Sequence, residues 1–407
     1  MKTFVAVLGR QPLISVAELE SLYEKVRIVA PSLAEFELGS EADLVPIARL
    51  GGTLKIAELI DEPMVKFWER LPESGKIVLG VSDFSKRTNP YLAQKEALRW
   101  KRILGKAGRN VRVVPNKTAV LSSATSWHNR LFTDTHIELL KNGNRYYRVV
   151  MVQDIDAYAK RDQARPARDA KVGMLPPKLA QILINLCGRQ PAGARLLDPF
   201  CGTGVVLQEG VLMGYVPYGT DKSERMVEYS ERNLKWLIGQ HAGTSDSVSL
   251  SESNPLRGRD SDPAQPENSP TPPACRHDIE PRFATGDATS YQWEGPIDLV
   301  ACETYLGAPM SQAPAEIKLR EAKQECKSII VGFLRNLSEQ VEPGTPVVIA
   351  VPAWLRPDKH YERLNLLDEI DELRYNVVRF KNLGQKDLLY HREGQVVARE
   401  IIVLRKK

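Results

Sequence analysis

Hydrophobic and polar residues alternate along the first 150 residues in short runs of two kinds. The runs FVAVLG, KIVLGVSDF, VRVVP and YRVVMVQ are rich in apolar and β-branched residues and predict strands. The stretches SVAELESLY and LAQKEALRWKRIL carry apolar residues at helical spacing and predict helices. The N-terminal part is therefore expected to form one or two small α/β units that end near Asp154.

A proline-rich connector follows in residues 161–190. It contains RPARDAKVGMLPPK, and the two adjacent prolines open the stretch PPKLAQILINLC, whose apolar positions recur at helical spacing. Proline suits the first turn of a helix because N–H groups there have no acceptor within the helix. We therefore expect a hinge and then the first helix of a second domain.

From Arg195 the pattern changes to strand, turn, helix and strand. ARLLDPF and YVPYGTD predict strands, VVLQEGVLMG and SERMVEYSERNLKWL predict helices, and FATGD, IDLVACE and PVVIAVP predict further strands. The last twenty residues, LLYHREGQVVAREIIVLRKK, resemble a closing hairpin. Because parallel strands need a crossover connection, usually a helix, the pattern predicts an α/β domain with a parallel sheet over residues 191–407.

One segment breaks this pattern, at about residues 240–281. It is rich in Ser, Pro, Asp and Gly and contains no aromatic residue. Such a composition buries too little apolar surface to offset the entropy of ordering. We expect a disordered insertion within the domain.

Composition limits the classes of protein to consider. The 407 residues contain no apolar run long enough to span a bilayer, and the N-terminus MKTFVAVLGR lacks a signal-peptide core. We therefore expect a cytoplasmic protein that does not bind to a membrane. The five cysteines are scattered without a C-x-x-C pair, which argues against disulfides and a zinc site. The net charge is +5, and basic residues gather at 85–112 and 158–171, so a polyanionic partner is compatible with the chain.

The strongest chemical signal is LLDPFCGTG, residues 196–204, where a buried strand ends at Asp198 and two glycines occupy the turn. Glycine lets backbone N–H groups approach a ligand closely before the next helix begins. A second strand ends in Asp221, where an acid can accept hydrogen bonds from ribose hydroxyls. Asp287 follows a third strand, where it could receive an adenine amine. Three acids at three strand ends predict one ligand-binding edge.

These residues carry a resemblance to a known family. Asp-Pro-Phe-Cys-Gly-Thr-Gly resembles the first motif of S-adenosylmethionine-dependent amino-methyltransferases. The upstream segment RDQARPARDAKVGMLPPKLAQILINLC, together with LSSATSWHNRLFTDTHIELL and VVMVQDIDAYAKRD, is similar to tRNA guanosine N2-methyltransferases of the archaeal and eukaryotic position-10 group. The resemblance covers most of the chain outside residues 240–281.

The resemblance implies a Rossmann-like methyltransferase domain and, within residues 1–160, a THUMP-like RNA-binding domain. It also implies S-adenosyl-L-methionine as the methyl donor, tRNA as the partner, and methyl transfer to the exocyclic N2 of a guanosine. It leaves open the exact nucleotide, the number of methyl groups and whether a small activator subunit takes part. The positions that correspond to the cofactor motifs are Asp198, Pro199, Gly202, Gly204, Asp221, Asp287 and Ala288.

The fourth strand of the predicted domain ends in DLVACETYLGAP, residues 298–309. The resembled family carries Asp/Asn-Pro-Pro-Tyr at this point. There the acid or amide and a proline carbonyl accept the hydrogens of the target amine, and the aromatic ring stacks on the extruded base. In this chain Glu303 can still accept from the amine and Tyr305 can still stack, so these two are the predicted catalytic residues.

The departure from the family pattern leaves alternatives. Alignment on Tyr305 puts Cys302 at the acid position, whereas alignment on the following glycine puts Glu303 there with a shift of one residue. A thiol attack by Cys302 on a pyrimidine ring is disfavoured, because a cysteine at the end of a buried strand is usually an apolar filler. A catalytically silent RNA-binding protein with this fold, and an amino-methyltransferase acting on rRNA or DNA, remain alternatives.

Overall fold

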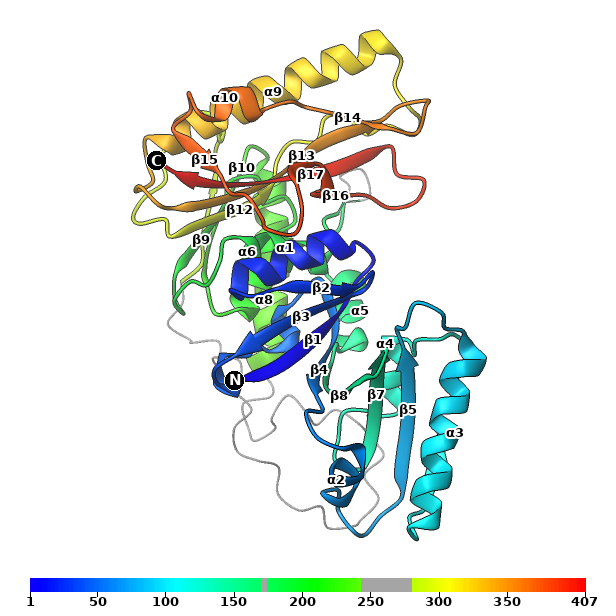
Figure 1. Cartoon of the computed structure of the whole chain (residues 1–407). Coiled ribbons are helices and arrows are strands. Elements are labelled where there is room, and N and C mark those ends of the chain that lie inside the picture. The colour runs from blue at the N-terminus through cyan, green and yellow to red at the C-terminus, as the bar shows by residue number, and fades with distance from the viewer. Residues whose placement is uncertain (170–173, 243–279) are drawn as a thin grey trace. The chain divides into compact units, whose positions relative to one another are not determined.

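The computed structural model describes residues 1–169, 174–242 and 280–407, which form two compact units (Figure 1). Unit 1 comprises Met1–Arg161 and Phe380–Asp387, and unit 2 comprises Asp162–Arg379 and Leu388–Lys407. The predicted insertion lies outside the described residues except for its two ends, as do residues 170–173 of the connector.

Unit 1 is built on a mixed sheet of eight strands in the order β2-β3-β1-β4-β8-β7-β5-β6. Strand β5 runs parallel to β6 and β7, and the other neighbours pair antiparallel. The strands are β1 (Lys2–Leu8), β2 (Arg27–Ala30), β3 (Leu33–Leu38), β4 (Thr53–Leu59), β5 (Ile77–Asp83), β6 (Val111–Val113), β7 (His136–Asn142) and β8 (Arg145–Val152).

The longest helix of unit 1 is α3, which has a clear start and one buried face. The side chain of Asn89 accepts a hydrogen bond from the Leu92 N–H at 2.9 Å and so caps the helix, with Pro90 in its first turn. Its buried residues Ala93, Ala97, Trp100 and Leu104 recur every three or four positions and so share one face. The helices are α1 (Pro12–Leu22), α2 (Met64–Glu69), α3 (Pro90–Lys106), α4 (Ser123–His128) and α5 (Ile155–Gln163).

A charged network lies inside unit 1. Lys55 of β4 and Glu138 of β7 form an ion pair of 2.6 Å with 1% and 0% of their side chains exposed. Ser82 and Ser126 each donate to the Glu138 carboxylate at 2.5 Å, and Lys55 also donates to the Leu121 carbonyl at 2.7 Å. Burial lowers the pKa of Lys55, whereas the Glu138 charge opposes that shift. This network joins strands and loops that are far apart in sequence.

A short segment from the C-terminal half, Phe380–Asp387, belongs to unit 1. The Glu20 carboxylate on α1 accepts hydrogen bonds from the backbone N–H groups of Lys381, at 2.6 Å, and Asn382, at 3.0 Å. The Asn382 side chain also donates to Glu20 at 2.7 Å. The sequence patterns did not predict this assignment, because the segment lies more than 350 residues from Glu20 in the chain.

Unit 2 is an α/β domain with a nine-stranded sheet. Its main path runs β11-β10-β9-β12-β13-β17-β15, while β14 pairs with β13 and β16 with β17. The first five strands of the path are parallel, and β17 runs antiparallel to β13. The strands are β9 (Arg195–Asp198), β10 (Val216–Asp221), β11 (Arg282–Thr285), β12 (Leu299–Glu303), β13 (Pro346–Leu355), β14 (Tyr361–Arg363), β15 (Tyr375–Val377), β16 (Leu389–Tyr390) and β17 (Val397–Lys406).

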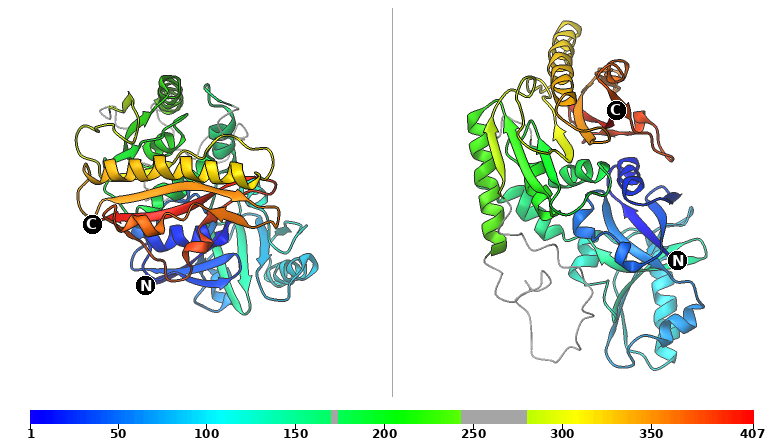
Figure 2. Two further views of the ribbon diagram at one scale, coloured as in Figure 1. Left: turned by 90° about the horizontal axis from the view of Figure 1, so that it is seen from above. Right: turned by 90° about the vertical axis from the view of Figure 1, so that its left-hand side faces the viewer.

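Helices cover both faces of this sheet (Figures 1 and 2). On one face, α9 contributes Ile330, Phe333 and Leu334 to a core that also contains Val300 and Ile349 of the sheet. On the other face, α6 and α7 contact each other and the central strands, and α8 contacts β10 and β11. The helices are α6 (Pro177–Leu186), α7 (Val205–Leu212), α8 (Glu224–Ala242), α9 (Glu316–Ser338) and α10 (Leu367–Ile370).

The Rossmann-like fold class predicted for this half of the chain is confirmed by the parallel strands, the crossover helices and the strand order. Strands β10 and β11 lie on one side of β9, while β12 and β13 lie on the other. In open α/β sheets, ligands bind beyond the carboxyl ends of the strands where the order reverses in this way. None of the helices among the described residues is long and apolar enough to cross a membrane.

Candidate active site

The glycine turn connects β9 to α7 and is hydrogen-bonded to the end of the neighbouring strand β10. β9 ends at Asp198 and α7 begins at Val205, so the turn lies at the carboxyl edge of the sheet. The Gly202 N–H donates to the Asp221 carboxylate at 2.9 Å, and the Cys201 N–H donates to the Thr220 carbonyl, also at 2.9 Å. The turn is therefore held against the end of β10.

The two glycines of the turn have different roles. Both have positive φ, +50° at Gly202 and +79° at Gly204, which disfavours other residues. A Cβ atom at Gly204 would lie 2.3 Å from the Ser230 hydroxyl on α8, so this glycine allows helix packing. A Cβ at Gly202 would approach only the Phe200 carbonyl, at 3.9 Å. Of the two, Gly202 is the position that borders open space where a ligand can reach the backbone.

Asp221 ends β10 with its carboxylate held in place by the backbone. One oxygen accepts from Gly202, and the other accepts from the Ser223 N–H at 2.9 Å. Burial raises the pKa of Asp221, although both hydrogen bonds oppose the shift. Each carboxylate oxygen can accept more than one hydrogen bond, so the group retains capacity for a ligand hydroxyl.

Asp287 lies beside Asp221, because the Gly286 N–H donates to the Asp221 carbonyl at 2.9 Å. Its carboxylate accepts from the Thr289 hydroxyl at 2.7 Å and the Thr289 N–H at 3.0 Å, and it pairs with Lys222 at 3.0 Å. The Thr289 hydrogen bonds, followed by the Lys222 contact, lower the pKa of Asp287 to about 2. The next residue, Ala288, is buried, and its carbonyl accepts from Asn336 at 3.0 Å.

Asp198 is the buried member of the acid group. It is 2% exposed, and its carboxylate accepts the Phe200 N–H at 3.1 Å across Pro199, which is also buried. Burial raises the pKa of Asp198 well above its usual range, and the charges of Asp221 and Glu303 add to the shift. Asp198 therefore shapes the turn, at the end of the strand that lies between β10 and β12.

Glu303 ends β12 and forms an ion pair that the sequence analysis missed. Its Oε1 accepts a hydrogen bond from Nε of Arg399 on β17, with 15% of the Glu303 side chain and 5% of the Arg399 side chain exposed. The two residues are 96 positions apart, so no local pattern could have linked them. The signal available in the sequence was an arginine inside the apolar stretch VVAREIIVL.

Cys302 is enclosed in the core and is not exposed at this edge. The residue is fully buried in the core cluster beside Val300, and burial raises the pKa of its thiol well above the usual range. Glu303, and not Cys302, is therefore the polar and partly exposed residue at the end of β12. A neutral thiol enclosed in the core is also a poor nucleophile, as the sequence analysis expected.

Tyr305 lies two residues beyond the strand end. Its hydroxyl donates to Glu325 of α9 at 3.3 Å, and its partly buried ring packs against the core cluster. Thr304 between the two predicted catalytic residues is held to β13, because its N–H and its hydroxyl both bond the Ala350 carbonyl, at 3.0 and 3.1 Å. The segment after β12 is therefore fixed on both sides.

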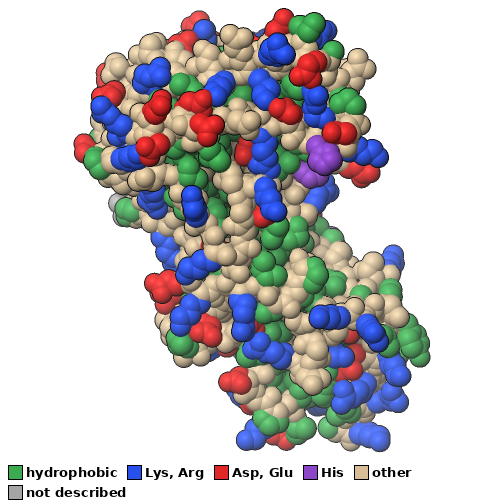
Figure 3. Space-filling view, turned by 45° about the horizontal axis from the view of Figure 1, so that its top comes forward, with side chains coloured by type: hydrophobic (Ala, Val, Ile, Leu, Met, Phe, Trp, Pro, Cys, Tyr) green, Lys and Arg blue, Asp and Glu red, His purple; other side chains and the backbone are tan. Residues whose placement is uncertain are grey.

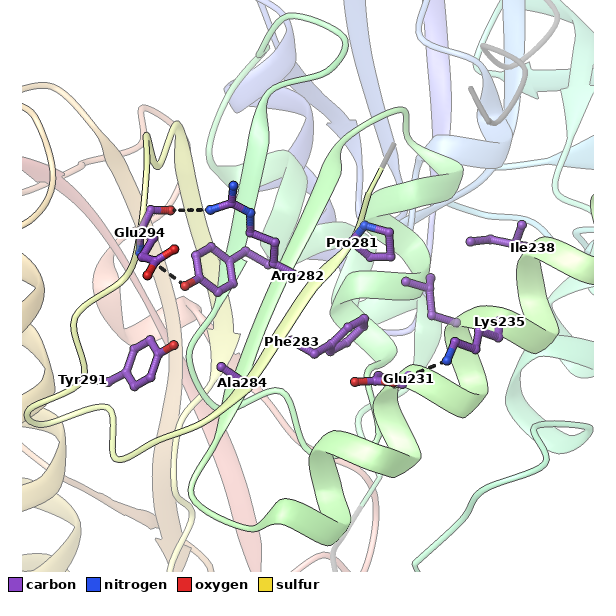
Figure 4. A pocket seen from close by; sticks show the side chains of 11 residues that line it. Glu231, Lys235, Ile238, Pro281, Arg282, Phe283, Ala284, Tyr291 and Glu294 are labelled. Carbon is purple, nitrogen blue, oxygen red and sulfur yellow. Dashed lines mark hydrogen bonds and ion pairs between the residues drawn. The ribbon is translucent and has the colours of Figure 1, made fainter. Parts of the chain in front are cut away.

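A hollow of about 490 Å³ lies in unit 2 away from this edge (Figure 4). It borders α8 and the start of β11, with Glu231, Lys235, Arg282 and Phe283 in its lining. In the register of the sheet, Arg282 lies opposite Tyr218, three residues before Asp221, so the hollow is near the amino ends of these strands. The hollow is therefore separate from the sheet edge that carries Asp198, Asp221, Asp287 and Glu303, which we call the acid edge. The described residues contain no cluster of His, Cys, Asp and Glu able to hold a metal ion.

Comparisons with known proteins agree with the fold. Residues 165–330 match the family model of the RMKL-like methyltransferase domain. A tRNA (guanine(10)-N2)-dimethyltransferase from Methanothermobacter thermautotrophicus is 44% identical over 99 residues, which are 24% of this chain and 28% of the relative. The protein of the same name from Pyrococcus abyssi is 45% identical over 62 residues, 15% of this chain and 18% of the relative. The chain thus spans less than a third of these curated relatives.

Among solved structures, TrmN from Thermus thermophilus aligns over 100% of both chains with a TM-score of 0.47 and 17% identity. A possible methylase from Clostridium difficile covers 86% of this chain and 89% of its own, with a TM-score of 0.40 and 13% identity.

The acid edge fits an adenosyl ligand. Gly202 leaves space for close approach to the backbone, and Asp221 beside it retains acceptor capacity for a ribose diol. Asp287, at the end of the neighbouring strand, is an acceptor within the same lip. This edge, with the strand order around it, lies in the part of the chain, residues 165–330, that matches the model of the RMKL-like methyltransferase domain.

Proposed function

We propose that this protein transfers a methyl group from S-adenosyl-L-methionine to the exocyclic N2 of a guanosine in tRNA. The observation that carries the proposal is the convergence at one sheet edge of the open turn at Gly202, the acceptor Asp221 and the strand-end acid Glu303. β10 and β12 flank β9 in the sheet, and the three strands end at Asp221, Glu303 and Asp198, so these acids lie at neighbouring strand ends. The short stretches shared with tRNA (guanine(10)-N2)-dimethyltransferases support the choice of acceptor.

In this proposal each residue has a separate task. When bound, the cofactor supplies a methyl sulfonium, which is the electrophile. Asp221 binds the ribose hydroxyls, and Asp287 binds the adenine amine. Glu303 accepts a hydrogen bond from the target amine, which aims the nitrogen lone pair at the methyl group and stabilises the positive charge that develops on nitrogen. The Tyr305 ring offers a face on which an extruded base stacks.

We expect Asp221→Ala to weaken S-adenosylmethionine binding by about 1.5–3 kcal/mol, the usual scale for hydrogen bonds to a charged group. Isothermal titration calorimetry of the full chain measures the change. Asp221→Asn is the matched control, because it keeps one carbonyl oxygen for the Gly202 N–H or a ribose hydroxyl and should lose less. Unchanged affinity in a folded Asp221→Ala protein would remove the ribose assignment.

RNA binding is proposed for unit 1, which we take to contain the THUMP-like domain. A groove of about 240 Å³ beside α3 is lined by five basic side chains and only two acids, which are Arg87, Lys95, Arg99, Arg102, Lys141, Asp83 and Glu96. Lys and Arg side chains gather over this end of unit 1 in the space-filling view (Figure 3). The exposed Tyr91, Leu98 and Ile103 on the same helix add apolar surface. Such a mixture suits phosphates and unpaired bases.

The logarithm of tRNA affinity should therefore fall linearly with the logarithm of salt concentration. Replacing both Lys95 and Arg102 with alanine should weaken binding and reduce the slope by about two units, roughly one for each lost phosphate contact. Filter binding at several salt concentrations measures both effects. Lys25→Ala, which removes an exposed cation of unit 1 outside the groove, is the control. An unchanged slope in the double variant would contradict this assignment.

One alternative has a specific observation in its favour. The Glu303 carboxylate is already paired with Arg399, and this pairing weakens its field at a neighbouring amine. A catalytically silent RNA-binding protein with a retained cofactor edge would have the same feature. Such a protein would bind S-adenosylmethionine and tRNA without transferring a methyl group. A single assay of methyl incorporation separates the two functions.

A further inference from the structure

The backbone of Arg399 is fixed by strands on both sides. In the sheet register Arg399 lies opposite Pro352 of β13 and opposite Tyr390 of β16. Its side chain reaches Glu303 across β13, and the β13 residue opposite Glu303 is the small Ala350. The guanidinium therefore comes from a strand that is paired on both sides, and it reaches the end of β12 across a small residue.

The charged residue next to Arg399 on β17 has an ion-pair partner of its own. Glu400, the next residue on β17, pairs with Arg363 of β14 at 2.5 Å. Successive residues of a strand point to opposite faces, so Arg399 and Glu400 belong to separate ion pairs. Among the described residues, Glu303 is hydrogen-bonded to Arg399 through Oε1, which leaves Oε2 as an acceptor at the strand end.

We propose that Arg399 is a positioning residue for methyl transfer, which holds the Glu303 carboxylate so that its second oxygen meets the target amine. The inference rests on the proposed function. A glutamate has three rotatable side-chain bonds, and a single acceptor is effective only when those bonds are fixed before the amine arrives. The Nε hydrogen bond to Oε1 supplies this restraint from a strand whose backbone cannot move independently.

Kinetics of the full chain with a tRNA transcript test the proposal. Arg399→Met keeps the length of the side chain but has no donor. We expect its kcat to fall at least tenfold, while KM for S-adenosylmethionine and for tRNA stay within about twofold, since neither ligand contacts Arg399 in this scheme. Arg399→Lys should recover part of the loss, because it restores a donor. A wild-type kcat in Arg399→Met overturns the inference.

Arg363→Met is the matched control, because it removes the partner of Glu400 from the same sheet without touching Glu303. It should lower the melting temperature with little change in kcat. Equal losses of kcat in Arg363→Met and Arg399→Met would mean that Arg399 is merely structural, which also overturns the inference.

The double variant keeps the test decisive if Arg399→Met alone fails to fold. Glu303→Gln removes the carboxylate that would be left unpaired, so Glu303→Gln with Arg399→Met should be better tolerated. Its kcat should equal that of Glu303→Gln alone, whereas a further tenfold fall overturns the inference. A wild-type protein that transfers no methyl group overturns the proposed function, and the positioning role with it.

Discussion

Replacement of Lys55 by methionine should lower the free energy of unfolding by about 3–5 kcal/mol, the usual cost of leaving one partner of a buried ion pair without its counterion. Glu138 would retain its two serine donors but lose the cation 2.6 Å away, with no solvent to replace it. Urea denaturation of the full chain, followed by a probe in unit 1, measures the change.

The control for this prediction is Lys2→Met, which removes an exposed cation that pairs with Glu58 at 2.8 Å. Exposed ion pairs contribute about 0–1 kcal/mol, so this variant should be close to the wild type. Changing Glu138 to methionine in the Lys55→Met background should recover stability, because the network then contains no unpaired buried charge. A loss below about 1 kcal/mol in Lys55→Met would contradict the account of the network.

Glu303→Gln should slow methyl transfer by two or more decades, which corresponds to about 3 kcal/mol for a preorganised electrostatic contact. Glutamine keeps one carbonyl acceptor but loses the charge that stabilises the developing positive nitrogen, and it also loses its charge-assisted bond to Arg399. Single-turnover transfer measures the rate, and calorimetry checks that cofactor binding survives. Glu294→Gln, at the hollow of Figure 4, is the matched control and should leave the rate unchanged.

A wild-type rate in Glu303→Gln would assign the chemistry to a different group. If Glu303→Gln transfers at the wild-type rate while Cys302→Ala is inactive, the thiol would carry the chemistry despite its burial. If both variants match the wild type, the amine would be held by backbone carbonyls beyond β12, and Glu303 would serve only the ion pair with Arg399.

Much of unit 2 was predictable because its strands are short apolar runs, several of which end at an acid. Such runs indicate a buried parallel strand, and β9, β10, β11, β12 and β13 all appear where the pattern predicted strands. The helix α9 was not among the predicted elements, although its buried Cys326, Ile330, Phe333 and Leu337 recur at helical spacing. Its first half, EIKLREAKQECK, is mostly polar and contains no continuous apolar run, so the pattern did not indicate a buried helix there.

The candidate site was predictable only as far as local sequence determines it. The turn at Gly202 and the acids at the strand ends follow from strand boundaries. The packing role of Gly204 depends on Ser230 of a helix that begins twenty residues later, and the partner of Glu303 comes from the antiparallel strand β17. Contacts of this kind are decided by tertiary packing, as is the assignment of Phe380–Asp387 to unit 1.

The central claim is methyl transfer to a guanosine amine of tRNA. Its most direct test is incubation of the purified full chain with S-adenosylmethionine carrying an isotopically labelled methyl group and an unmodified tRNA transcript, followed by mass spectrometry of the nucleosides. The account predicts label in N2-methylguanosine or its dimethyl form, and its loss in Glu303→Gln. No incorporation into tRNA in the presence of bound cofactor, or label on a pyrimidine carbon, would contradict it.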